Sequence, residues 1–223
     1  MGKILEQWQG YISLILQGAL VTIEITILGC IVALIAAFIA GLGRISRFWP
    51  LRWIATAYIE FFRGTSIFVQ LFWAYFVLPL LGVPLSPLQA AVLALGLNVG
   101  AYGAEVVRGA IKSIPREQYE ACTALNLTRF QEMRYVILPQ AFVRMLPTFG
   151  NNAIELLKGT AVVSLISLSD MTFQAQVVRA QTGSTAVPFL AILLLYFVFS
   201  STISTAIRRL EWRLSRGLDG TGN

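Results

Sequence analysis

The chain alternates long uncharged stretches with short groups of charged residues. A bilayer core of about 30 Å needs roughly twenty apolar residues in a helix that rises about 1.5 Å per residue. Runs of this size predict an all-α integral membrane protein with five membrane-spanning helices. We expect these spans at about 23–42, 66–82, 87–107, 139–157 and 187–207.

The ends of some runs are informative. The first run begins at Ile12 and exceeds one span, so residues 12–22 are expected at the membrane interface. The third run opens with Ser86, which can cap free N–H groups, and Pro87, whose missing donor costs nothing at a first helical position. The segment 161–168 is apolar but too short to cross, so it is expected to be re-entrant or interfacial.

Composition narrows the possible functions. The chain is 57% hydrophobic and 13% charged, with a mean hydropathy of +0.72, which is too apolar for one water-solvated core. It has no histidine, and Cys30 and Cys122 lie far apart, so neither His-based catalysis nor a metal site is expected. We therefore expect a chain that is not an enzyme and binds no cofactor itself.

Much of the excess positive charge, formally +6, lies in the predicted loops. Cations cluster after the first run, between the third and fourth runs, and after the fifth run, all on one predicted side. The positive-inside rule then places the N-terminus outside and the C-terminus in the cytoplasm. A nucleic-acid partner is not expected, since it would need one exposed basic face.

The loop 115–139 carries the most specific pattern. Glu117 and Glu120 fall in a short helix after Pro115, and Asn126 tolerates a left-handed turn. A second amphipathic helix from Thr128 is expected to place Phe130, Met133 and Ile137 on one face. From periodicity alone, a folded linker explains this loop equally well.

The spacing in this loop closely resembles the EAA motif of ABC importer permeases. The matching residues are Glu120-Ala121-Cys122, Asn126 and Val136-x-Leu138-Pro139, with Cys122, Asn126 and Val136 replacing Ala, Gly and Ile. Stretches such as 58–65 and 97–109 are similar to the polar amino acid branch, and the whole chain is most similar to ectoine and hydroxyectoine permeases. The resemblance covers nearly all of the chain.

The resemblance implies a type I ABC importer permease fold over residues 1–223, in a bacterial inner membrane. It also implies three partners: an ABC ATPase dimer, a second identical or homologous permease, and an extracytoplasmic solute-binding protein. The loop 115–139 would be the cytoplasmic coupling loop. Its implied ATPase-docking residues are Glu117, Glu120, Ala121, Cys122, Asn126, Leu138 and Pro139. Because the chain has no phosphate-binding loop motif, ATP and Mg²⁺ would bind to the separate ATPase.

Polar residues inside the predicted spans are candidates for a solute path, because ionisable groups in a bilayer are costly. In the third run, Asn98, Tyr102 and Glu105 share one face, opposite Gly96, Gly100 and Gly103, and Glu105 is expected to pair with Arg108. In the fourth run, Arg144, Asn151, Glu155 and Lys158 share a stripe if the helix continues through Pro147. The substrate-path candidates are Asn98, Tyr102, Asn151, Glu155 and Lys158.

Two questions stay open from the sequence. Glu155 and Lys158 either neutralise one another within the bundle or meet the two charged ends of a zwitterionic solute. The expected function is the membrane subunit of an ATP-driven importer for a polar amino acid or a relative such as ectoine. The alternatives are a secondary transporter or channel subunit that works without ATP, and a membrane scaffold that transports nothing.

Overall fold

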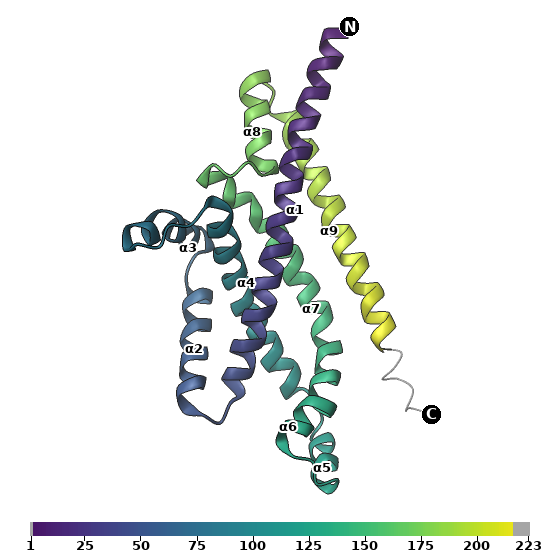
Figure 1. Cartoon of the computed structure of the whole chain (residues 1–223). Helices are drawn as coiled ribbons and strands as arrows, with labels where there is room; N and C mark the ends of the chain where they lie inside the picture. Colours follow the sequence, from purple (N-terminus) through teal and green to yellow (C-terminus); the bar gives the residue numbers. More distant parts are fainter. Residues whose placement is uncertain (1, 216–223) are drawn as a thin grey trace.

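The computed structural model describes residues 2–215, with side chains from residue 10 onward, and every regular element in that range is helical. The long helices run side by side, and a small helical hairpin projects at one end (Figure 1). The elements are α1 (Gly2–Ile45), α2 (Trp49–Gly64), α3 (Ile67–Phe72), a π-helix (Trp73–Val77), a 3₁₀ helix (Leu78–Leu81), α4 (Pro87–Lys112), α5 (Arg116–Ala124), α6 (Arg129–Gln131), a π-helix (Glu132–Ile137), α7 (Leu138–Gly159), a 3₁₀ helix (Thr160–Ile166), α8 (Met171–Thr182) and α9 (Ala186–Ser215).

Three helices in the described residues are long and apolar enough to cross a membrane: residues 10–45 of α1, α4 and α9. Two bent pairs also qualify if each pair counts as one span. The first joins α2 to the segment Ile67–Leu81 across a bend of 106°, and the second joins Arg129–Ile166 to α8 across 52°. The predicted all-helical membrane fold is therefore present, with two of its five candidate spans broken.

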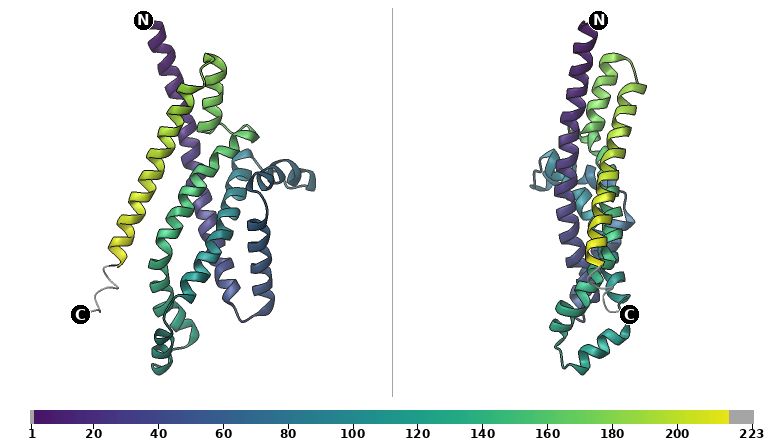
Figure 2. Two further views of the ribbon diagram at one scale, coloured as in Figure 1. Left: turned by 180° about the vertical axis from the view of Figure 1, so that it is seen from behind. Right: turned by 90° about the vertical axis from the view of Figure 1, so that its right-hand side faces the viewer.

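Small residues bring α1 and α4 close together in the centre of the bundle (Figures 1 and 2). A Cβ on Gly96 would lie 2.7 Å from Val32 Cβ, and one on Gly103 would lie 2.8 Å from Ala37 Cβ. Such close approach is typical of glycine faces in membrane helices. The prediction that the glycine face of this helix packs against a neighbour is confirmed. The buried Ala33, Ala91, Leu95 and Leu156 form the core beside it.

The start of α1 is continuous with the first predicted span. Residues 12–22 belong to one helix that runs without a break to Ile45, and Thr22 is fully buried. This part of α1 packs against α8 and α9 through Ile15, Ala19 and Ala175. Burial against two other helices stabilises this continuous helix, and the interfacial location of residues 12–22 stays a prediction.

The segment 66–82 differs from the prediction, because no single straight helix spans it. Six residues of α3 are followed by a π-helix and a short 3₁₀ helix that contains Pro79 and ends at Gly82, whose φ is 87°. Helix α2, which precedes this segment, runs alongside α1 (Figure 1). Proline and the left-handed glycine end the segment, since neither continues an α-helix.

The remaining helices begin near the predicted positions. Ser86 and Gln89 form a capping box at the start of α4, with Pro87 in its first turn, as expected. Helix α7 continues through Pro147. In α9, Thr202 and Thr205 donate to carbonyl oxygens one turn back, so these hydroxyls serve the helix itself.

Candidate functional site: a docking loop and polar helix faces

The projecting hairpin is built by local signals in the loop 115–139. Helix α5 ends at Ala124, and Asn126 adopts a left-handed conformation with φ of 51°, as predicted. Thr128 then starts the next helical segment with a capping box, in which Gln131 accepts from the Thr128 backbone N–H. A π-helix, Glu132–Ile137, connects this segment to α7. The hairpin therefore has a fixed shape and lies beyond the other helices (Figure 2).

The inner face of α5 is tied to the bundle. Tyr119 donates its hydroxyl to Ile111 O at 3.1 Å, and Gln140 Nε2 donates to Gln118 Oε1 at 3.1 Å. Burial, with smaller contributions from Glu132 and Cys122, raises the pKa of Tyr119, so its hydroxyl keeps the proton that it donates. Cys122 is 2% exposed. The hairpin is therefore anchored to α4 and α7.

The outer face of the hairpin is open. Of the predicted docking residues, Glu117, Glu120, Ala121, Asn126 and Pro139 are exposed, whereas Cys122 is buried and Leu138 is half-buried. Cys122 and Leu138 therefore lie less open to a partner than the other five residues. Leu125 and Phe130, each 72% exposed, add an apolar surface that the sequence analysis did not assign to docking.

One expectation for this loop is wrong. Met133 and Ile137 pack into the core beside α4 and α7, but Phe130 points away and is exposed. The π-helix between them explains the difference, because its extra residue per turn changes the phase of an ideal helix.

On α4, Asn98 is buried and hydrogen-bonded instead of open to a path. Its Nδ2 donates to Phe62 O at 3.0 Å and to Gln70 Oε1 at 3.1 Å. Gln70 was missed in the sequence analysis, although it is the only amide in the apolar run 66–82. These bonds place Asn98 at the bend between α2 and α3.

Tyr102, one turn further along α4, is 38% exposed and lies beneath Arg63 of α2. The guanidinium carbon of Arg63 is 5.3 Å from the centre of the ring, which is within cation–π range. A cation stacked on a partly open aromatic ring is a surface that can accept a carboxylate. Arg63 joins Tyr102 as a candidate that spacing alone did not pair.

Helix α7 presents the predicted polar stripe. Asn151, Glu155 and Lys158 are all exposed. Arg144, nearer the start of α7, is also exposed and donates to Ser113 O at 2.5 Å. In the part of the chain that the structure describes, neither Glu155 nor Lys158 has an ion-pair partner. The two side chains thus do not form an ion pair with one another in this structure. No hydrogen bond between described side chains links these residues to Asn98 or Tyr102.

Near the other end of α4, Glu105 joins two helices. It accepts from Arg44 of α1 and from Arg108, whose Nη2 lies 2.7 Å from Glu105 Oε2, so the predicted Glu105–Arg108 pair is confirmed. Glu60 of α2 pairs with Arg44 at 3.4 Å, whereas Arg63 turns to Tyr102. Four charges thus connect α1, α2 and α4.

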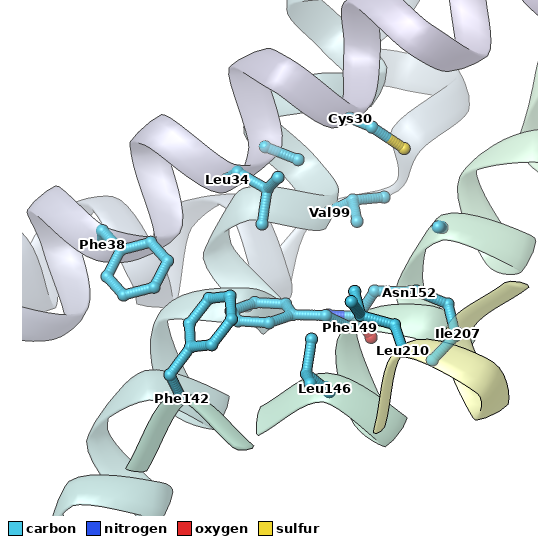
Figure 3. Close-up of a pocket in the computed structure, with 13 residues that line it drawn as sticks. Cys30, Leu34, Phe38, Val99, Phe142, Leu146, Phe149, Asn152, Ile207 and Leu210 are labelled. Atoms are coloured by element: carbon cyan, nitrogen blue, oxygen red, sulfur yellow. The ribbon is translucent and has the colours of Figure 1, made fainter. Parts of the chain in front are cut away.

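An apolar cavity of about 310 Å³ lies between α1, α4, α7 and α9 (Figure 3). Leu34, Phe149 and Ile207 contribute to its wall, and Asn152 is a polar side chain among them. Asn152 Nδ2 is buried without a hydrogen-bond partner among the described residues. The cavity contains no charged group, so it does not resemble a site for a zwitterion.

Comparisons with known proteins identify the family. Residues 29–216 match the family model of the binding-protein-dependent transport system inner membrane component. The chain is 42% identical to a probable amino-acid ABC transporter permease, y4tF, of Sinorhizobium fredii (strain NBRC 101917 / NGR234), over 96% of this chain and 93% of that protein. It is 37% identical to the glutamine transport system permease GlnP of Escherichia coli (strain K12), over 91% of this chain and 94% of the relative.

A solved structure agrees with these relatives. A crystal structure of an amino acid ABC transporter with histidines aligns with a TM-score of 0.86 and 34% identity, over 93% of this chain and 97% of that chain. The match extends from the first long helix to the last, so the all-helical type I permease fold is shared. The chain therefore belongs to the inner-membrane components of binding-protein-dependent transport systems, and it is an amino-acid ABC transporter permease.

Proposed function

We propose that this chain forms half of the membrane pathway of an ATP-driven importer for a polar amino acid or a similar zwitterion. In this arrangement the chain crosses the membrane five times, counting each bent pair once, with the N-terminus outside. A solute-binding protein delivers cargo at the outer end. Family membership favours this function over a secondary transporter or channel.

The observation that carries the proposal is the outer face of α5. Glu117, Glu120 and Ala121 are exposed there, beside the exposed Leu125, while the inner face of the same helix is anchored to α4 and α7. A rigidly anchored helix with a mixed acidic and apolar face suits a groove in a partner. We propose that the partner is an ABC ATPase dimer that binds ATP and Mg²⁺, and that its closure moves α4 and α7 through this helix.

Glu120→Lys tests the docking surface. Among the described residues Glu120 pairs only with the exposed Arg116, at 3.0 Å, so the substitution should leave the fold intact and act at the interface. We expect the ATPase to co-purify more weakly and solute-stimulated uptake in proteoliposomes to fall by about ten-fold or more. Glu211→Lys on α9 makes the same charge change outside the loop and should preserve both. Normal uptake with a firmly bound ATPase in Glu120→Lys would contradict the assignment.

The solute is proposed from chemistry. Glu155 and Lys158 of α7, which have no ion-pair partner among the described residues, offer charges of both signs to a zwitterion, together with Tyr102 and Arg63. We propose that a second permease, identical or homologous, faces the α7 stripe so that these charges line a shared path away from lipid. GlnP is named for glutamine, which fits a polar amino acid. Ectoine stays a prediction that these relatives do not support.

A further inference from the structure

A second pocket, of about 250 Å³, opens where α1 ends, α2 begins and α4 ends. This is the end of the bundle that carries the α5 hairpin (Figure 1). Its lining combines four cations with two tryptophans and one threonine, and it contains no carboxylate. The lining residues are Arg44, Trp49, Arg52, Trp53, Thr56, Arg108 and Lys112.

The positive charge of this pocket is only partly balanced. Glu105, which does not line the pocket, forms ion pairs with Arg44 and Arg108, and Glu60 forms an ion pair with Arg44. Arg52 and Lys112 are exposed and have no ion-pair partner in the described part of the chain. Two cations therefore remain free to meet an anion in a pocket that two further arginines already make positive.

The tryptophans indicate where the pocket sits relative to the bilayer. Trp49 and Trp53 occupy successive turns of α2 and are 64% and 63% exposed. Tryptophan side chains favour the headgroup level of a membrane, where an apolar ring meets polar groups. The neighbouring Ile54 and Phe61, each 61% exposed, continue an apolar surface along α2. Cations at the headgroup level with an apolar surface beside them match the two parts of a phospholipid.

We propose that this pocket binds an anionic phospholipid of the leaflet that surrounds the α5 end. The lipid phosphate would lie between Arg52 and Lys112, with the tryptophan rings against the glycerol region and the acyl chains along α2. Basic pockets between membrane helices are known to hold such headgroups. The inference needs only the membrane location of the chain, so it does not depend on which solute is carried.

The test measures quenching of tryptophan fluorescence by lipid. The full chain is placed in phosphatidylcholine nanodiscs that contain increasing fractions of acyl-brominated phosphatidylglycerol. The fluorescence of the two pocket tryptophans is obtained by subtracting the fluorescence of a Trp49→Phe/Trp53→Phe variant from that of the unchanged chain. We expect saturating quenching at a low fraction of the anionic lipid. Brominated phosphatidylcholine should quench only in proportion to its abundance.

Arg52→Gln/Lys112→Gln is the decisive variant, because neither side chain forms an ion pair or a hydrogen bond with another described residue. Each cation near a membrane surface strengthens binding about five-fold, so half-saturation should need about 25-fold more phosphatidylglycerol. Arg208→Gln/Arg209→Gln removes the same charge from α9 and should change little. The proposal would be overturned if the half-saturating fraction of phosphatidylglycerol shifted equally in the two double variants, or did not shift in Arg52→Gln/Lys112→Gln. It would also be overturned if free inorganic phosphate competed with the lipid as well as the lipid competes with itself.

Discussion

At the scale of single residues, the close packing of α1 on α4 depends on positions where no side chain fits. Gly41 is the tightest of these at the α5 end of α1. A Cβ there would lie 2.7 Å from Val107 Cβ and 2.8 Å from the carbonyl oxygen of Ala104. A backbone oxygen in a helix cannot move aside as a flexible side chain can, so the two helices would have to separate.

Gly41→Ala should therefore lower the unfolding free energy by about 1–3 kcal/mol, which is the usual cost of overpacking a core. The measurement is the thermal unfolding midpoint in detergent. Gly109→Ala is the matched control, since Gly109 lies in α4 with nothing within 4 Å of its Cβ position. That change should leave the midpoint unchanged or raise it slightly, because alanine favours the helix. Equal midpoints for both variants would contradict this account of the packing.

At the scale of elements, the bend between α2 and α3 is held by two amides. Gln70 Nε2 donates to Phe62 O at 3.0 Å and to Thr65 Oγ1 at 2.7 Å, while Gln70 Oε1 accepts from Asn98. Carbonyls freed at the end of α2 thereby find partners in α3 and α4. The bend is thus a hydrogen-bonded joint and not a flexible link.

Gln70→Leu should weaken this joint, because it keeps the volume but leaves buried polar atoms of Phe62 and Asn98 with fewer partners. The expected cost is about 1–3 kcal/mol, seen as a lower unfolding midpoint. Gln174→Leu on α8 is a control with the same chemical change at a half-buried position, where the side chain makes no hydrogen bond with another described residue. If Gln70→Leu is no more destabilised than this control, the amides do not hold the bend.

The elements also show what the sequence could predict. The cap at Ser86, the turn at Asn126 and the glycine face of α4 depend on local chemistry, and each was predicted correctly. The bend after Gly64 and the exposure of Phe130 could not be predicted, because they depend on a tertiary amide network and on a π-helix that has no simple pattern. Likewise, the partner of Glu60 was decided by the approach of α1, which spacing within α2 does not reveal.

At the scale of the whole molecule, the single chain leaves charges on α7 that a bilayer would not tolerate. Glu155 and Lys158 are exposed and unpaired among the described side chains, while the opposite face of α7 is buried at Met145 and Leu156. An exposed charge pair in a membrane helix is expected to face water or another protein. The isolated chain therefore presents one surface that is suited to an assembly.

Glu155→Gln and Lys158→Met, alone and together, test whether this surface handles solute. We expect each single variant to lower binding-protein-stimulated uptake by about ten-fold, as loss of a charged hydrogen bond would. Uptake by the double variant should be no higher than uptake by either single variant. Glu24→Gln on α1 is a matched control at another exposed carboxylate and should transport normally. Recovery in the double variant would show a structural pair, and normal transport would remove both residues from the path.

The unbroken length of α1 has a consequence for the surrounding lipid. Residues 12–42 contain one charge, Glu24, and as a helix they extend about 46 Å, whereas the uncharged residues 87–104 of α4 extend only about 27 Å. Because Arg44 pairs with Glu105, the two helices are level at that end, and the surplus of α1 lies beside α8. The hydrophobic thickness of this subunit is thus uneven, so the bilayer around it should be thicker beside α1 than beside α4.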